Sequence, residues 1–104
     1  MAFELFVNND NLVSLLGLTD VQTGMVVNTA TVQVTLRDTL NRVITGPITM
    51  PHVPTSSGNY QAVIPATTGI VAGQSYRATI TATGTGTAEW DIPVTAQWRD
   101  AVSP

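Results

Sequence analysis

The sequence contains no cysteine and no lysine, and charged residues make up only 11% of its 104 residues. Without cysteine, neither a disulfide framework nor a cysteine-based zinc site can form. The single histidine, His52, excludes a histidine-rich metal cluster in the same way. Nucleic-acid binding requires clustered lysine or arginine side chains, whereas this chain has four scattered arginines and a formal net charge of −3. We therefore expect no metal site and no nucleic-acid partner.

The low charge also bears on what the surface contacts. An average soluble domain carries roughly 25% charged residues, so here the surface must be covered largely by threonine, glutamine, asparagine, serine and small apolar groups. A monomer usually keeps more charge for solubility. Two interpretations remain open: a poorly charged soluble domain, or a chain whose surface is mostly used in a homo-oligomer or another multicopy assembly.

The N-terminal sequence MAFELFVNNDNLVSLLGL has no basic leader. Its apolar run at residues 12–18 is short and is interrupted by Ser14 and Gly17, which is typical of neither a signal peptide nor a membrane span. We expect production in a cytoplasm, no signal peptide and no membrane partner.

Strand signals dominate the sequence, whose length suits a single domain over residues 1–104. No window sustains the apolar period of a helix. The clearest strand is TVQVTLRD at residues 31–38, where Val32, Val34 and Leu36 alternate with polar residues. We predict an all-β fold, a single immunoglobulin-like β-sandwich of about seven to eight strands with a short N-terminal arm or strand. The other strands are expected at residues 3–7, 12–18, 25–27, 43–45, 48–50, 59–65, 76–82 and 90–96, with a break at Gly46-Pro47.

A more specific pattern occupies residues 70–82, IVAGQSYRATITA, where an apolar residue, a small residue, glycine and tyrosine precede an alternating strand. It resembles the corner between sheets in fibronectin type III and related immunoglobulin-like domains. The resemblance implies a tyrosine corner, in which Gly73 turns the chain and the Tyr76 hydroxyl bonds to upstream backbone. The residues support this role directly, because a chain that crosses between sheets leaves backbone groups unpaired, and a phenol at the rim can satisfy one of them.

Most of the chain shares a wider pattern: a leucine-rich opening strand, ATVQVTLRD, a Gly-Pro break, GNYQAVIPATTGIVAGQSYRATITA and a closing EWDIPVTAQWR. This pattern is similar to small immunoglobulin-like proteins encoded among the virion genes of tailed bacteriophages. The resemblance implies a non-enzymatic structural protein of the virion, either a capsid decoration (cement) protein or a neck or tail component. Its partners would then be other virion proteins, namely the major capsid protein or neck and tail proteins.

Residues with catalytic or ligand-binding chemistry are few. Glu89 and Asp91 lie two apart on one strand face, where a carboxylate pair can bind a cation or act as acid and base. An exposed pairing with Arg77 on the neighbouring strand is the favoured interpretation. Cation binding at the two carboxylates stays open.

Two further motifs are incomplete. His52 has Ser56 nearby, but the G-x-S-x-G elbow of a serine hydrolase is missing, so we interpret His52 as a loop residue. Gly84 and Gly86 lack the third glycine and the following helix of a dinucleotide site. We expect neither enzymatic activity nor a cofactor.

The remaining candidate for function is the outward half of the strand alternation. Flat, neutral sheet faces and edges can pair with other chains, and lysine, which often prevents such pairing, is absent. An ordinary solvated sheet is the alternative. The candidate interaction surface comprises Phe3, Leu5, Phe6, Thr31, Gln33, Thr35, His52, Thr79, Thr81 and Trp98.

A carbohydrate- or cell-surface-binding immunoglobulin-like module is the second functional hypothesis. It requires an aromatic platform, and Trp98 would supply one if its side chain faced solvent. Alternation with Ile92 and Val94 favours a core position for Trp90. Trp98 lies near the chain end, and its position is left open between core and surface.

Overall fold

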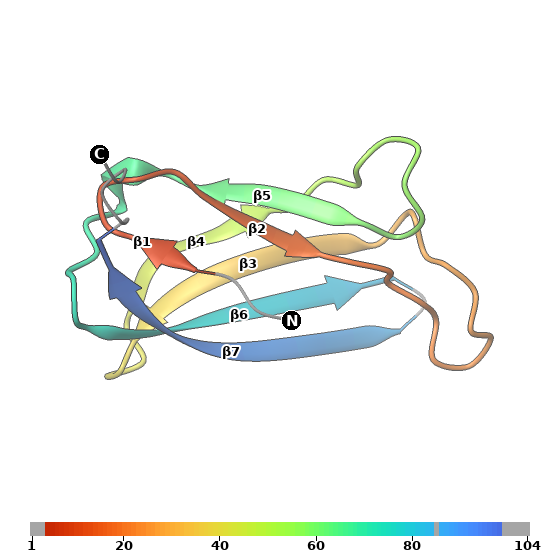
Figure 1. The fold of residues 1–104 in the computed structure, drawn as a ribbon. Coiled ribbons are helices and arrows are strands. Elements are labelled where there is room, and N and C mark those ends of the chain that lie inside the picture. Colours follow the sequence, from red (N-terminus) through yellow and green to blue (C-terminus); the bar gives the residue numbers. More distant parts are fainter. Residues whose placement is uncertain (1–3, 85, 99–104) are drawn as a thin grey trace.

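The structure, a computed structural model, describes residues 4–84 and 86–98. The predicted all-β class is confirmed: the described chain forms seven strands and a single 3₁₀ turn, η1, at Ala66–Thr68. No helix in these two ranges has the length and apolar character needed to cross a membrane. The strands are β1 Leu5–Phe6, β2 Asn11–Leu15, β3 Thr31–Asp38, β4 Val43–Thr49, β5 Tyr60–Ile64, β6 Ser75–Thr83 and β7 Thr87–Gln97 (Figure 1).

Five strands form a mixed sheet in the order β1-β7-β6-β3-β4. At its centre, β3 and β6 pair antiparallel from Thr31 opposite Thr83 to Asp38 opposite Tyr76. β6 continues into β7 as an antiparallel hairpin, and the short β1 adds a parallel edge beside the end of β7. The sheet therefore joins the N-terminal and C-terminal strands of the described chain.

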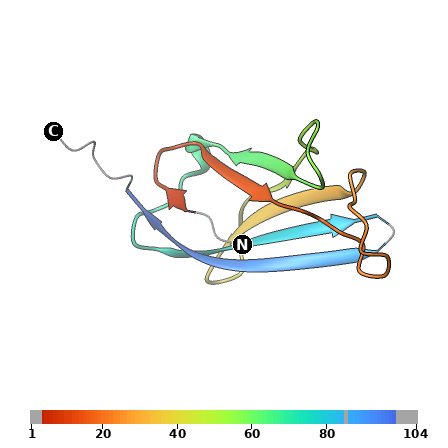
Figure 2. The ribbon, with the colours of Figure 1, turned by 45° about the vertical axis from the view of Figure 1, so that its right-hand side comes forward.

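The other two strands, β2 and β5, form an antiparallel pair that lies across one face of the five-stranded sheet (Figures 1 and 2). One hydrophobic core fills the space between the two layers. Its buried members include Val13 and Leu15 from β2, Tyr60 and Ile64 from β5, Val32, Val34 and Leu36 from β3, and Ala78 and Ile80 from β6.

The alternation seen in the sequence becomes the two faces of each long strand. Along β6, Tyr76, Ala78, Ile80 and Ala82 are buried, and the residues between them are half-buried or exposed. β7 is less deeply placed: Ala96 is buried, whereas Trp90, Ile92 and Val94 are half-buried and pack against the core. The predicted inward faces of β6 and β7 are thus confirmed.

The strand predicted at residues 25–27 is wrong, because residues 19–26 close a tight turn. The Asp20 carboxylate accepts hydrogen bonds from the N–H groups of Gln22 and Thr23, and the N–H of Gly24 donates to the Asp20 carbonyl. Only an isolated bridge joins Thr19 to Val26. The side-chain and backbone bonds of one aspartate therefore replace the expected strand pairing.

The break in pairing predicted at Gly46-Pro47 is confirmed, although the strand β4 itself runs through both residues. Val34 lies opposite Ile48 and Leu36 opposite Thr45, so Gly46 and Pro47 have no register partner and β4 accommodates one additional residue there as a bulge. Proline has no N–H to donate, but β4 is the edge of the sheet, where a ladder bond on the outer side is not required.

The predicted corner before β6 contains the expected hydrogen bond. The N–H of Val71 donates to the Tyr76 hydroxyl at 2.9 Å, and the Tyr76 side chain is buried. Gly73 has φ +86°, a left-handed conformation that glycine adopts without steric cost, and its N–H donates to the Ala96 carbonyl. The corner therefore joins the turn before β6 to the end of β7.

A second buried tyrosine, Tyr60, has a similar role that the sequence pattern did not indicate. Its hydroxyl donates to the Val27 carbonyl at 2.7 Å and accepts from the N–H of Ala30 at 3.2 Å. Tyr60 lies on β5, so it attaches the long connection between β2 and β3 to the small sheet. Two further side-chain bonds, from the N–H of Gly58 to Asn28 Oδ1 and from the N–H of Gly17 to Asn59 Oδ1, join the same connection to the segment before β5.

Candidate interaction surface

The small sheet covers one face of the five-stranded sheet, and the opposite face carries the outward side chains of β3, β6 and β7. Register places Thr31, Gln33 and Thr35 of β3 directly opposite Thr83, Thr81 and Thr79 of β6. β7 extends the face with Thr87, Glu89, Asp91 and Thr95. The structure thus brings together five of the predicted surface residues, Thr31, Gln33, Thr35, Thr79 and Thr81, which we call the threonine face.

The threonine face is uncharged, and most of it is half-buried. Thr31 is exposed, whereas Gln33, Thr35, Thr79 and Thr81 are half-buried. The face therefore offers hydroxyl, amide and methyl groups rather than charges, which suits contact with another protein surface.

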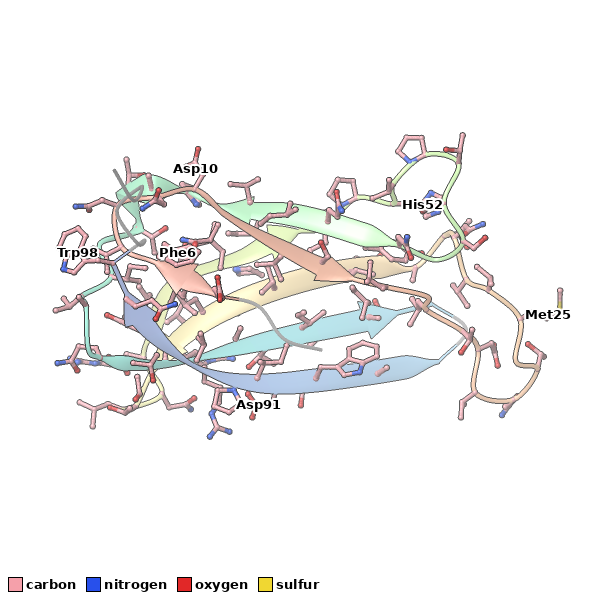
Figure 3. The ribbon with its side chains drawn as sticks, in the orientation of Figure 1. Phe6, Asp10, Met25, His52, Asp91 and Trp98 are labelled. Atoms are coloured by element: carbon pink, nitrogen blue, oxygen red, sulfur yellow. The ribbon has the colours of Figure 1, made fainter. Side chains whose placement is uncertain are left out.

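Charged side chains gather at one end of this face. Arg37 and Arg77 lie directly opposite each other on β3 and β6, an arrangement that is unfavourable for like charges unless they are compensated. Arg77 forms an ion pair with Asp91 at 2.6 Å, Asp91 accepts from the Thr79 hydroxyl at 3.4 Å, and Arg37 donates to the same hydroxyl at 3.4 Å. The predicted pairing of Arg77 with a β7 carboxylate is confirmed for Asp91, whose side chain points away from the core (Figure 3).

These charged residues line a shallow hollow of about 570 Å³ that also includes Asp38, Glu89 and Pro93. Asp91 is already engaged by Arg77, and in the described part of the chain no three histidine, aspartate or glutamate side chains are grouped to hold a metal ion. A second, smaller cavity of about 150 Å³ lies between residues 18–22 and the β6–β7 hairpin, with a mixed lining of apolar residues, glycines and polar residues that include Asp20 and Gln22.

Asp38 fixes the turn between β3 and β4 at the edge of the hollow. Its Oδ1 accepts from the N–H groups of Leu40 and Arg42, and its Oδ2 accepts from Arg42 Nε at 2.8 Å. The hydrogen bond from the backbone N–H of Arg42 is the largest cause that lowers the pKa of Asp38 below its ordinary value, and the Arg42 guanidinium and the Leu40 N–H add to it. The same hydrogen bonds that favour the ionised carboxylate therefore hold the turn between β3 and β4 together.

The structure contradicts one of the contact residues predicted in the N-terminal arm. The prediction of Leu5 as a surface residue is wrong: it is fully buried beside Ala96, because β1 inserts its side chain into the core. Phe6 is half-buried at the outer edge of the sheet and remains a candidate. Phe3 lies outside the described residues.

His52 is not a free loop residue. It forms an isolated bridge to Tyr60, its ring meets the Tyr60 ring edge-on with centroids 5.5 Å apart, and Nε2 lies 3.3 Å from the Ser56 carbonyl oxygen. These contacts hold the loop at residues 51–58 against β5. Its half-buried imidazole lies on the side of the small sheet, at the opposite end of the molecule from Trp98 (Figure 3).

Trp98 faces solvent, with 62% of its surface exposed. It follows β7 at the end of the molecule where Phe6 also lies (Figure 3). Neither the hollow on the threonine face nor the smaller cavity is lined by Trp98. The sequence left open whether Trp98 lies in the core or on the surface, and its exposure places it on the surface. Its indole is therefore an exposed aromatic surface that borders neither of these two cavities.

Sequence reasoning missed a second exposed surface, on the outer side of the small sheet. Leu12 and Val63 are exposed and directly opposite each other in register, and Leu16 follows on the same side of the chain. The sequence NLVSLL at residues 11–16 indicates this surface, because apolar residues occupy both the inward and the outward positions of the strand. A strand with that pattern has two apolar faces, of which only one is covered here.

No family model, no curated protein and no solved structure matches this chain.

Proposed function

We propose that this protein is a non-enzymatic structural component of a bacteriophage virion, either a decoration (cement) protein that stabilises the capsid or a component of the neck or tail. The assignment to a virion comes from the sequence resemblance. The observation that carries a contact role is the threonine face: five uncharged side chains on the side of the five-stranded sheet that the small sheet leaves uncovered. The centres of protein–protein interfaces are likewise depleted of charged residues.

The strand order supports an immunoglobulin-like sandwich as the scaffold. Adjacent β3, β6 and β7 correspond to the C, F and G strands of such domains, and the β2–β5 pair corresponds to B and E. The buried Tyr76 lies at the start of β6, where immunoglobulin-like domains place the tyrosine corner. β4 then takes the place of the additional C′ strand beside C.

In this role the protein acts through surface contacts. The partner is another virion protein that covers the threonine face, and the Arg37–Thr79–Asp91–Arg77 network supplies charge-assisted hydrogen bonds at the rim of the contact. Many copies of one small domain on a repeating lattice would strengthen the particle without any chemical step.

The direct test is quantitative mass spectrometry of purified virions from the phage whose genome encodes this chain. We expect the protein at many copies per particle, in fixed proportion to the major capsid protein or to a neck or tail protein. Absence from purified virions, with the protein present in the infected cell, would contradict the proposal.

One observation favours the second hypothesis, a carbohydrate- or cell-surface-binding module: the exposed indole of Trp98. Sugar rings stack on such surfaces through the aromatic face. A glycan array comparing the wild type with Trp98→Ala tests it. Glycan binding that disappears in the variant would support this module, and binding that is absent or unchanged would remove its basis.

A further inference from the structure

The small sheet leaves the outer edge of β2 without a strand partner. In the described part of the chain β2 pairs only with β5. The outer edge of β5 is partly occupied, because the N–H of Gln61 donates to the Pro51 carbonyl and the N–H of Val53 donates to the Asn59 carbonyl. Among the described residues no segment covers the edge of β2 in this way, so its backbone can accept another strand.

The side chains of the small sheet do nothing to prevent this pairing. β2 and β5 read NLVSL and YQAVI, with no charged residue and no proline. On their outer side Leu12 is 56% exposed opposite Val63, and Leu16 is 67% exposed. The edges of the large sheet differ, since β4 carries Pro47 and a bulge, and β1 is only two residues long.

The beginning of β2 is excluded from the open edge. The buried side-chain amide of Asn11 is occupied by the backbone of Phe6, from which it accepts one hydrogen bond and to which it donates another. The segment available for pairing is therefore residues 12–16.

We propose that a second copy of this chain binds this edge, with the two β2 strands antiparallel about a two-fold axis at Ser14. The small sheets then join into one four-stranded sheet in the order β5-β2-β2-β5. In this register Leu12 lies opposite Leu16 of the partner subunit on the outer side, and Val13 lies opposite Leu15 of the partner subunit on the core side. Outward residues meet only outward residues, as sheet pairing requires.

A second copy fits this edge for three reasons. The segment is reciprocal, because the same register places each exposed leucine against the other one on the partner, which gives a closed, isologous contact. The strands of the small sheet are uncharged, so two identical copies do not repel each other there. A two-stranded sheet is also short by the standards of folded proteins, and pairing brings it to the ordinary four strands. The inference rests on the small sheet alone and does not depend on the virion role.

Analytical ultracentrifugation of the full chain tests the pairing. We expect the wild type to reach twice the mass of one chain as its concentration rises, and Leu16→Lys to weaken this dimer by more than about tenfold in Kd. The matched control is Leu40→Lys, because Leu40 is 70% exposed in the β3–β4 turn and Leu16 is 67% exposed. Leu40→Lys should dimerise like the wild type. A wild type that stays monomeric up to about 1 mM, or a dimer that Leu16→Lys leaves intact, would overturn the proposal.

Cysteine cross-linking tests the register, because the native chain contains no cysteine. Ser14→Cys places one thiol beside its symmetry mate, within the range in which disulfides form. Mild oxidation should convert this variant to a covalent dimer and leave Ser57→Cys, on the exposed loop, largely monomeric. Equal cross-linking of the two variants would contradict the two-fold axis at Ser14. Circular dichroism shows whether each variant is folded.

The two proposals fail separately. A wild-type dimer that is missing from purified virions contradicts the virion role alone. A monomer that virions do contain contradicts the β2 pairing alone.

Discussion

The side-chain amide of Asn11 holds the backbone of Phe6 as a neighbouring strand would. Asn11 Oδ1 accepts from the Phe6 N–H at 2.8 Å, and Asn11 Nδ2 donates to the Phe6 carbonyl at 3.0 Å. Phe6 belongs to the five-stranded sheet and Asn11 begins the small one, so this amide connects the two layers where β1 would otherwise be a bare edge. Asn11 is only 3% exposed and is the one fully buried polar residue in the described chain.

Removing this amide should be costly. Asn11→Ala leaves the partly buried N–H and carbonyl of Phe6 without their side-chain partner, and we expect a loss of about 1–3 kcal/mol in the free energy of unfolding. The control is Asn9→Ala, which loses a single bond from its side chain to the Val7 carbonyl at a half-buried position. Urea denaturation of both variants measures the difference, and equal losses would contradict the connecting role of Asn11.

The corner tyrosine gives a second prediction. Tyr76→Phe removes the hydroxyl that accepts from the Val71 N–H, and we expect about 1–3 kcal/mol of destabilisation from the orphaned donor. Amide exchange at Val71 should also become faster. A variant as stable as the wild type would show that the hydroxyl does not hold the corner.

Tyr60→Phe should destabilise the protein at least as much as Tyr76→Phe. The Tyr60 hydroxyl makes two bonds, to the Val27 carbonyl and from the Ala30 N–H, whereas the Tyr76 hydroxyl makes one with backbone. Its loss frees the connection between β2 and β3. Hydrogen exchange should therefore accelerate at Ala30 in Tyr60→Phe and remain unchanged there in Tyr76→Phe. The reverse pattern would contradict this assignment.

Gly24 and Gly58 have similar backbone angles but different surroundings, so comparing them distinguishes the cost of a left-handed backbone from the cost of a steric clash. Gly58 and Gly24 have φ +75° and +71°, but a Cβ at Gly58 would lie 2.7 Å from the Leu18 carbonyl oxygen, whereas one at Gly24 would meet nothing within 4 Å. Gly24→Ala should cost about 1–2 kcal/mol for the left-handed conformation. Gly58→Ala should cost clearly more, because the two loops must move apart. Thermal denaturation measures both, and equal effects would count against the close packing of Gly58 on Leu18.

Low pH should reduce the free energy of unfolding, partly because the Asp38 carboxylate becomes protonated. The pKa of Asp38 is lowered in the folded state, so its stabilisation is complete above the ordinary value of 3.8 and is lost as the pH falls through the lower folded value. Asp38→Asn keeps an acceptor for the backbone N–H groups but removes the charge. The difference in unfolding free energy between wild type and Asp38→Asn should be larger at about pH 7 than at about pH 2. A difference that does not change with pH would contradict the role of the charge.

Alternation identified the long strands of this protein because each has one face in the core. TVQVTLRD became β3, and the run from Tyr76 to Ala82 became the inward face of β6. The residues at 25–27 were misjudged for a local reason that periodicity does not report, because the Asp20 carboxylate closes a turn there. The break in pairing at Gly46-Pro47 was predicted correctly, but the sequence did not show that the edge strand β4 continues through it.

The sequence could predict which candidate residues share a surface only where they alternate along a regular strand. Thr31, Gln33, Thr35, Thr79 and Thr81 share one face because β3 and β6 are adjacent in register. Leu5 and His52 could not be placed in this way. A two-residue strand has no periodicity that distinguishes its inner from its outer side, and the contacts of His52 with Tyr60 and Ser56 depend on a loop conformation that the sequence does not specify.

Under the proposed virion role, co-sedimentation with purified phage capsids and tails tests most directly whether the threonine face is the binding surface. Gln33→Lys places a charge at the centre of that face, and the control Gln22→Lys makes the same substitution on an exposed turn. We predict that the wild type and Gln22→Lys pellet with one of the two particles and that folded Gln33→Lys stays in the supernatant. A wild type that pellets with neither particle, or a Gln33→Lys variant that pellets as well as the wild type, would contradict the account.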